Sequence, residues 1–176
     1  MRTDAKICGM GHSMKRKEDP RFIRGKGNYV DDIKLPGMLY MDIVRSPYAH
    51  ARIKKIDTSK ALKIPGVLAV IDGPTLEKYK LHWMPTISAD TQMVLPTDEV
   101  MYQAQEVCAV IATERYLAAD GADAVEVDYE PLPVTVDPLK SIAPGAPVLR
   151  KDKKDKKDNL AFHWEAGDRN DAERAL

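Results

Sequence analysis

The sequence lacks an excess of charge and has few of the residues that build metal or disulfide frameworks. Lys plus Arg number 27 and Asp plus Glu also number 27, so no overall basic field would attract nucleic acid. The two cysteines, Cys8 and Cys108, lie far apart and do not form a CxxC pair. These absences argue against a nucleic-acid-binding protein, a disulfide framework and a cysteine-rich metal site.

Long hydrophobic runs are also absent. No apolar stretch approaches the roughly 20 residues that cross a bilayer, and no apolar core of a signal peptide precedes Pro20. Reduced thiols and the absence of a secretion signal predict a cytoplasmic protein, and association with the inner face of the membrane is left open. The length of 176 residues suits one domain with additional tails.

The stretch 29–57 has the clearest local pattern, a turn and a strand followed by a second turn and strand. Proline and glycine at 36–37 reverse the chain before the apolar run 38–44, which predicts a buried strand, although its Leu and Met residues would also suit a helix. Residues 51–57 then alternate between apolar and charged side chains. That alternation predicts a half-buried strand with a polar outer face.

Further strands and short helices follow this stretch. Strands are predicted at 67–71, 106–112 and 125–129, and short extended segments at 93–96 and 100–102. Pro131 and Pro133 either place the last strand at a sheet edge or end it. Short helices are predicted after caps at Thr58 or Ser59, after the turn 72–75, and after a cap at Thr113. The small residues Ala118, Gly121 and Ala124 would let the last helix lie close to a sheet, whereas residues 19–22 are expected to break any helix.

The composition changes along the chain predict four segments. Residues 1–18 form an extended polar arm, 19–140 a folded domain, 141–160 a proline-rich and charged linker, and 161–176 the truncated start of another domain.

The sequence shows no set of residues typical of a self-contained active site. The four histidines are far apart and none has a second metal ligand at helical or turn spacing; they are His12, His50, His82 and His163. Gly25-x-Gly27 lacks the third glycine and the preceding strand of a dinucleotide-binding loop. We therefore expect neither zinc nor a nucleotide at these positions.

Several polar residues could still carry chemistry, and each has a structural alternative that we favour. His50 is the best polar candidate, with a hydrogen-bonded structural histidine as the alternative. Cys108 lies within an apolar strand, where a thiol packs as a small hydrophobe and keeps a high pKa. Asp31 and Asp32 would face opposite ways on a strand, which favours turn capping over acid–base chemistry. Arg45 could bind an anion, but an ion pair that holds its loop is favoured.

Two further groups are weighed in the same way. The basic run 15–17 could touch nucleic acid, but a solvated or subunit-contacting arm is favoured in a neutral chain. Trp83, with Met84 beside it, and Trp164 could line a ligand pocket, but core or interface packing is favoured. No catalytic, cofactor-binding or metal-binding residue is assigned to this chain.

A set of motifs in register resembles the N-terminal region of the large subunits of the xanthine oxidase family of molybdenum hydroxylases, over roughly residues 18–138. These motifs are Tyr29-Val30-Asp31-Asp32, Leu35-Pro36-Gly37-Met38-Leu39, Arg45-Ser46-Pro47, Ala49-His50-Ala51-Arg52-Ile53, Ile56-Asp57, Pro65-Gly66-Val67, Val100-Met101-Tyr102, and the runs 107–112 and 125–133. Within the family, the segments 81–86, 103–107, 148–150 and 164–168 most resemble the carbon monoxide oxidising type. Many relatives have a glycine near Ala104, and that type shares its absence.

The resemblance implies a fold, cofactors and partners. It implies an α/β hammerhead domain of the α+β class, a mixed sheet with short helices, which agrees with the elements above. It implies a large subunit that holds molybdopterin cytosine dinucleotide with molybdenum and copper, an iron–sulfur small subunit with a 2Fe–2S cluster, an FAD-binding medium subunit, and a dimer of heterotrimers. The start of a further domain after residue 160 would then be the start of the molybdopterin-binding domain.

The resemblance also implies where the chemistry lies. The cysteine that binds copper and the glutamate beside molybdenum belong to segments beyond Leu176, so this segment would bind no cofactor and be inactive alone. The implied reaction is the oxidation of carbon monoxide with water to CO2. The alternatives are a related aldehyde or N-heterocycle hydroxylase, or a stand-alone binding or assembly module of the same fold. The substrate and the electron acceptor are not determined by this stretch.

Overall fold

The computed structural model describes residues 10, 15–84, 92–151, 157–164 and 166–175, in two units. Unit 1 spans Met1–Met38 and unit 2 spans Leu39–Leu176. Most of the predicted arm, with Cys8 and His12, lies outside the described residues, and so does most of the charged run after Lys151.

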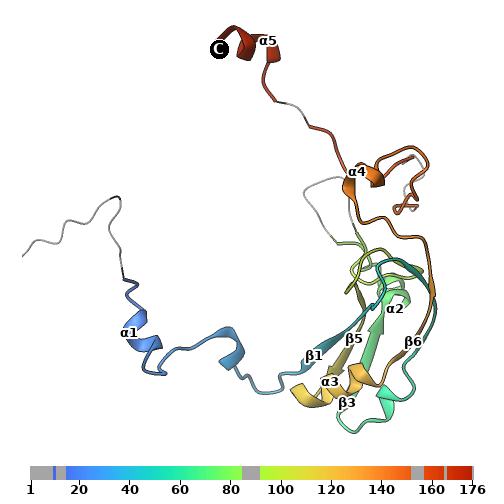
Figure 1. Cartoon of the computed structure of the whole chain (residues 1–176). Coiled ribbons are helices and arrows are strands. Elements are labelled where there is room, and N and C mark those ends of the chain that lie inside the picture. Colours follow the sequence, from blue (N-terminus) through green and yellow to red (C-terminus); the bar gives the residue numbers. More distant parts are fainter. Residues whose placement is uncertain (1–9, 11–14, 85–91, 152–156, 165, 176) are drawn as a thin grey trace, which may run out of the picture. The chain divides into compact units, whose positions relative to one another are not determined.

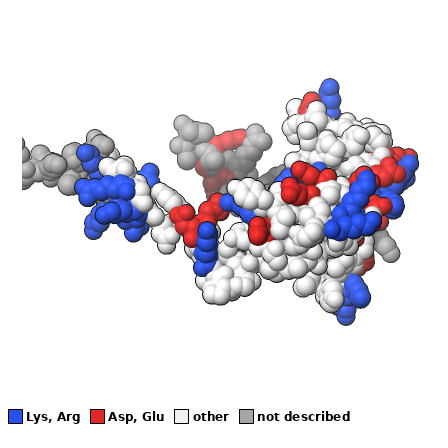
Figure 2. Space-filling model, turned by 90° about the horizontal axis from the view of Figure 1, so that it is seen from below, with Lys and Arg blue, Asp and Glu red and all other residues white. Residues whose placement is uncertain are grey.

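Unit 1 contains two short helical segments, α1 (Asp19–Phe22) and the 3₁₀ helix η1 (Val30–Asp32). The prediction that residues 19–22 break any helix is wrong. Pro20 occupies the first turn of α1, where the N–H that proline lacks has no acceptor within the helix. None of the described residues of unit 1 is buried, and Figure 2 shows Lys and Arg gathered over this part of the chain.

Unit 2 is built on two three-stranded antiparallel sheets (Figure 1). Sheet A has the order β1-β5-β3, in which the strands are β1 (Tyr40–Arg45), β5 (Glu106–Ala112) and β3 (Val67–Asp72). Sheet B has the order β4-β2-β6, in which the strands are β4 (Glu99–Val100), β2 (Ala51–Asp57) and β6 (Glu126–Pro131). The predicted edge position of the last strand is confirmed. The extended segment predicted at 93–96 is reduced to an isolated bridge between Met93 and Trp83.

Short helices lie between the strands and after the last one. They are η2 (Ala61–Lys63), α2 (Gly73–Lys78), α3 (Arg115–Asp123), α4 (Pro138–Ser141) and α5 (Arg169–Ala175). The caps predicted before η2 and α3 are wrong, since neither helix has a side-chain cap. Thr113 lies one residue before the N-cap of α3, and its N–H donates to the Gly66 carbonyl at 2.9 Å. Asp72, in the predicted turn 72–75, does cap α2 by accepting from the Thr75 N–H.

The core lies between α3, one face of sheet A and one face of sheet B. Cys108 and Val110 of β5 are fully buried there, together with Ala61 and Val125. A Cβ on Gly121 would come within 2.7 Å of a Val110 methyl group, which confirms the close approach predicted for α3. The strand predicted in the run 38–44 is present as β1, but the prediction that it is buried is wrong, because β1 is an edge strand and Met41 is 62% exposed. Within the described residues, no helix is both long and apolar enough to cross a membrane.

Candidate functional site

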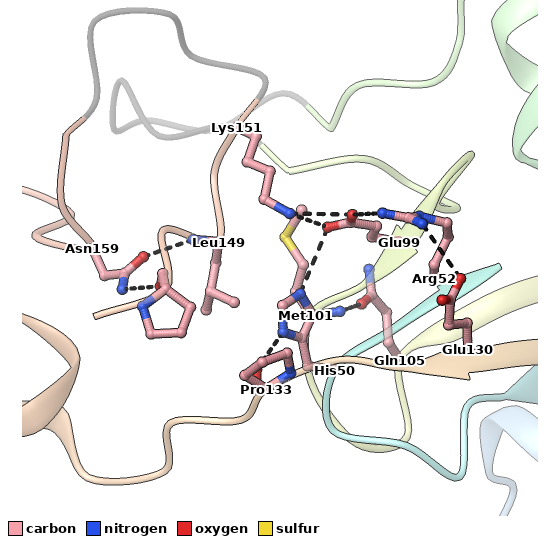
Figure 3. A network of polar contacts seen from close by, with 11 residues as sticks. His50, Arg52, Glu99, Met101, Gln105, Glu130, Pro133, Leu149, Lys151 and Asn159 are labelled. Atoms are coloured by element: carbon pink, nitrogen blue, oxygen red, sulfur yellow. Dashed lines mark hydrogen bonds and ion pairs between the residues drawn. The ribbon is translucent and has the colours of Figure 1, made fainter. Parts of the chain in front are cut away.

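The most connected polar cluster of the described residues is centred on Glu99. Glu99 begins β4, which pairs with β2 so that Glu99 lies directly opposite Arg52. Arg52 Nη2 lies 3.9 Å from Glu99 Oε1, and its other terminal nitrogen, Nη1, lies 3.3 Å from Glu130 Oε2 on β6. Figure 3 shows His50 and Arg52, from the start of β2, and Lys151, from the segment after α4, around this carboxylate.

His50 is held between a backbone carbonyl and Glu99. Its side chain is 4% exposed, Nδ1 lies 2.7 Å from the Pro133 carbonyl oxygen, and Nε2 lies 3.6 Å from Glu99 Oε2 (Figure 3). Because a carbonyl oxygen can only accept, Nδ1 carries the proton and donates it. The Leu132 N–H also donates to the His50 carbonyl at 3.0 Å. His50 therefore fastens the chain after β6 to the start of β2, as the structural alternative predicted.

Lys151 brings the segment after α4 to the same carboxylate. Its Nζ lies 3.0 and 3.2 Å from the two oxygens of Glu99. Burial alone would raise the pKa of Glu99, but the hydrogen bond and charge of Lys151, with the contact to His50, lower it below its ordinary value. Glu99 is thus held as a carboxylate whose partners are supplied within the chain.

Asn159 anchors the described ends of the predicted linker. Its side-chain oxygen accepts from the Leu149 N–H at 2.8 Å, and its amide nitrogen donates to the carbonyls of Ser141 at 3.0 Å and Pro147 at 2.8 Å. Figure 3 shows Asn159 reaching Leu149 in this way. The boundaries 141–160 stay a prediction, but their described ends are fastened by hydrogen bonds.

A cavity of about 390 Å³ lies beside this cluster. Gln105, 7% exposed, forms part of its wall and accepts a hydrogen bond from the Met101 N–H at 2.6 Å. Trp83 also lines the cavity, 38% exposed and with the Arg150 guanidinium 6.0 Å from its ring centroid. The remaining lining residues are Gln92, Met93, Pro96, Thr97, Asp98, Glu99, Met101, Tyr102, Leu149, Arg150 and Lys151. Trp83 thus belongs to a pocket wall, whereas Trp164 is 76% exposed and outside the core.

The other predicted candidates are dispersed and have structural roles. Cys108 is fully buried in β5, and this burial, followed by the charge of Asp72, raises the pKa of its thiol to about 12. Arg45 forms an ion pair with Glu106 and donates to the Ala104 carbonyl at 2.9 Å, so the predicted ion pair that holds its loop is present and joins the end of β1 to the start of β5. Asp32 accepts from the Tyr29 N–H at 2.9 Å, as expected of a turn cap.

The remaining candidates are divided between the two units. Residues 15–17 and Gly25-x-Gly27 belong to unit 1, and the basic run is exposed. His82 is half-buried and packs against Trp83, whereas His163 is exposed. These basic and glycine positions belong to unit 1, whereas the Glu99 cluster belongs to unit 2.

The arrangement around Glu99 is suited to holding segments together rather than to reacting. His50 Nδ1 faces the Pro133 carbonyl and Nε2 faces Glu99. The hydroxyl of Ser46, which could otherwise act as a nucleophile, donates to the Tyr48 carbonyl at 3.0 Å. Within the described part of the chain, no three His, Cys, Asp or Glu residues are grouped so that they could hold a metal ion. Sequence reasoning missed Glu99, Lys151 and Asn159, and of these only Glu99 had a local signal, its place just before the predicted extended segment 100–102.

Comparison with known proteins gives a family. The sequence profile described as "Aldehyde oxidase and xanthine dehydrogenase, a/b hammerhead domain" matches residues 24–133. The chain is 56% identical to the carbon monoxide dehydrogenase large chain of Afipia carboxidovorans, over 93% of this chain and 21% of that protein. It is 52% identical to the corresponding large chain of Hydrogenophaga pseudoflava, again over 93% of this chain and 21% of that protein.

A solved structure agrees with these sequences. The crystal structure of a Cu,Mo-CO dehydrogenase in its carbon monoxide reduced state matches with a TM-score of 0.80 and 54% identity, over 96% of this chain and 22% of that chain. The chain therefore spans about a fifth of the length of the relatives it matches. The predicted α+β hammerhead fold is confirmed, and the chain belongs to the aldehyde oxidase and xanthine dehydrogenase family as its a/b hammerhead domain.

Proposed function

We propose that this chain is the N-terminal scaffold domain of a molybdenum hydroxylase large subunit of the carbon monoxide dehydrogenase type. The observation that carries the proposal is the identity of 56% and 52% to two carbon monoxide dehydrogenase large chains across 93% of the chain. The Glu99 cluster supports a scaffold role, because its charged groups are paired with one another.

The reaction of the whole enzyme would be the oxidation of carbon monoxide with water to CO2, releasing two protons and two electrons. The electrons would pass to an iron–sulfur subunit and an FAD subunit, in a dimer of heterotrimers located in the cytoplasm. The large subunit would hold molybdopterin cytosine dinucleotide with molybdenum and copper. The similarity of this chain to a solved Cu,Mo-CO dehydrogenase supports this cofactor assignment.

The residues that the structure describes do not fit the role of metal ligands. Copper and molybdenum bind thiolate, imidazole or carboxylate groups that converge on one point. Cys108 is buried and its thiol is protonated at neutral pH, since its pKa is about 12. We therefore propose that this segment supplies no catalytic, cofactor-binding or metal-binding residue, and that the four segments 1–18, 19–140, 141–160 and 161–176 are its arm, domain, linker and the start of the cofactor-binding domain.

The test uses the natural large subunit with its partner subunits, purified from the source cells. We expect reduction of an electron-accepting dye that depends on carbon monoxide, together with molybdenum and copper in the complex. Activity with an aldehyde or an N-heterocycle but not with carbon monoxide would assign a related hydroxylase. Stoichiometric molybdenum in the purified 176-residue chain would refute the scaffold role, and the absence of any associated redox subunit would favour a stand-alone assembly module.

A further inference from the structure

His50 uses only one of its two ring nitrogens in a hydrogen bond. Its side chain is 4% exposed, and Nδ1 donates to the Pro133 carbonyl oxygen at 2.7 Å. Nε2 is also buried and has no hydrogen-bond partner among the described residues. Figure 3 shows the ring between Pro133 and Glu99, and Nε2 lies 3.6 Å from Glu99 Oε2. Buried polar atoms are rarely left without a partner, so the position of this nitrogen is unusual.

The two protonation states of the ring differ in what Nε2 offers to Glu99. In the neutral ring the proton is on Nδ1, so Nε2 presents a lone pair to a carboxylate oxygen, and two acceptors cannot form a hydrogen bond. In the protonated ring both nitrogens donate. A charge-assisted hydrogen bond is about 2.7–2.9 Å long, so a movement of less than about 1 Å would close the gap to Oε2. Proton uptake would therefore turn an unpaired contact into a hydrogen-bonded ion pair.

The charged groups around this pair come from several elements of unit 2. Glu99 is on β4, Arg52 Nη2 on β2 lies 3.9 Å from Glu99 Oε1, and Lys151 Nζ after α4 lies 3.0 Å from Oε2. Glu130 on β6 lies 3.3 Å from Arg52 and balances its charge. Burial raises the pKa of Glu99, but Lys151 and His50 lower it below its ordinary value, so Glu99 remains a carboxylate at mildly acidic pH. A proton taken up by His50 therefore meets a negative charge.

Lys151 and His50 compete for the same carboxylate oxygen. Lys151 Nζ lies 3.0 Å from Oε2 and 3.2 Å from Oε1 of Glu99, and its side chain is 60% exposed. An exposed ammonium regains water when it moves away from a carboxylate, whereas a buried imidazolium has no such replacement. Protonated His50 should therefore take the larger share of Oε2.

We propose that His50 is a proton-dependent latch, which in its protonated form donates to Glu99 and so ties the chain after β6 to β4. In that state a continuous path of hydrogen bonds runs from the Pro133 carbonyl through the imidazole to the carboxylate. The Leu132 N–H, which donates to the His50 carbonyl at 3.0 Å, belongs to the same connection. In the neutral state the carboxylate is held mainly by Lys151, and the chain after β6 is fastened to His50 but not to Glu99.

The test is hydrogen–deuterium exchange of the Leu132 amide in the full chain, followed by NMR. The 19.7 kDa chain is measured at about pH 7.5 and about pH 5.5, on either side of the ordinary pKa of histidine, about 6.5. Each rate is divided by that of an unstructured peptide at the same pH, so that the protection reports local opening. The protection of Leu132 should rise about tenfold at the lower pH, as expected when one charge-assisted hydrogen bond resists opening. The protection of Thr113, whose N–H donates to the Gly66 carbonyl at 2.9 Å, should not change.

Three variants separate a latch from a merely structural histidine. Glu99→Gln removes the charge but keeps the His50 ring, so the rise in protection should disappear. Lys151→Met removes the competing ammonium, so the rise should become larger. His82→Gln is the matched control, because the described ring contact of His82 is with Trp83, at 5.7 Å between ring centroids, and the rise should be unchanged.

Each other outcome overturns the inference. Equal protection of Leu132 at the two pH values would show that His50 is only structural. A rise that persists in Glu99→Gln, or one that is lost in His82→Gln, would assign the effect to another group, and a rise that Lys151→Met leaves unchanged would contradict the competition for Oε2. NMR of the ¹⁵N-labelled histidine rings tests the parent chain without any variant: Nε2 of His50 should carry a proton at the lower pH only, and a nitrogen that stays bare at both would refute the latch.

Discussion

The contact between Glu99 and Lys151 should stabilise the fold measurably, because the carboxylate is partly withdrawn from water. Glu99 is 15% exposed, whereas Lys151 is 60% exposed, so the attraction is stronger than at a fully solvated pair but is still screened by solvent. Exposed pairs contribute about 0–1 kcal/mol, and hydrogen bonds to charged groups about 1.5–3 kcal/mol. Because the Lys151 side chain is mostly exposed, we expect a coupling energy between the two side chains of about 1 kcal/mol.

A double-mutant cycle measures this coupling directly. The variants are Glu99→Gln, Lys151→Met and the double variant, each followed by urea unfolding. The matched control is the cycle Glu126→Gln and Lys60→Met, a second Lys–Glu pair whose side chains are 62% and 64% exposed. We expect coupling in the first cycle and none that can be measured in the second. Equal coupling energies in the two cycles would refute the argument from burial.

The same contact predicts how stability depends on pH. The pKa of Glu99 is lowered in the folded chain, since the hydrogen bond and charge of Lys151 outweigh burial. A carboxyl whose folded pKa is lowered stabilises the fold above its unfolded pKa, and this contribution is lost as the pH falls through the folded pKa. The difference in stability between the parent chain and Glu99→Gln should therefore shrink as the pH is lowered from 7 into the acid range below about 4.3, the ordinary pKa of glutamate. A difference that is constant with pH would contradict this assignment.

Three further predictions concern backbone and packing. A Cβ on Gly73 would lie 2.3 Å from the Pro96 carbonyl oxygen, so Gly73→Ala should lower the free energy of unfolding by about 2 kcal/mol or more. The control is Gly145→Ala, which meets no atom within 4 Å but has φ +86°, so it should lower the free energy of unfolding by about 1 kcal/mol. Equal losses of the two variants in urea unfolding would contradict the clash at Gly73. Ala104 has φ +66°, so Ala104→Gly should stabilise the chain by about 0.5–1 kcal/mol in the same assay, and a loss would contradict the strain. In a Cys8→Ser background, Cys108 should resist a thiol reagent at pH 8 until urea unfolds the chain, because burial raises its pKa to about 12; rapid labelling of the folded chain would refute this.

The strands could be predicted from the sequence because their signals are local. β5 and β3 are short apolar runs rich in Val, Ile and Ala between turns, and the glycine and alanines of α3 fit the close approach to Val110. Burial of β1 could not be predicted in the same way, since its place at the edge of sheet A depends on pairing with β5, more than 60 residues further along the chain. Hydrophobic composition alone does not distinguish a buried strand from a half-covered one.

The caps and the polar cluster show a second reason for failure. Thr113 is a good capping residue by type, but its N–H is bound to the Gly66 carbonyl, and α3 begins one residue later than that signal predicts. His50, Glu99 and Lys151 each have an ordinary local sequence, and they meet only because β2 pairs with β4 and the chain after α4 returns to sheet B. A set of residues brought together by long-range pairing leaves no spacing that a local pattern can detect.

Ala104 connects these points to the family. The resemblance implies that many relatives have glycine near residue 104. The Ala104 backbone adopts φ +66°, a region that favours residues without a Cβ, and this conformation is a physical reason for glycine there. The Ala104 N–H donates to the Ser46 carbonyl at 2.9 Å, and its own carbonyl accepts from Arg45 at 2.9 Å, so the turn before β5 is tied to the loop after β1 on both sides. These two hydrogen bonds can offset a strain of about 1 kcal/mol. Alanine is therefore tolerated at a position whose backbone favours glycine.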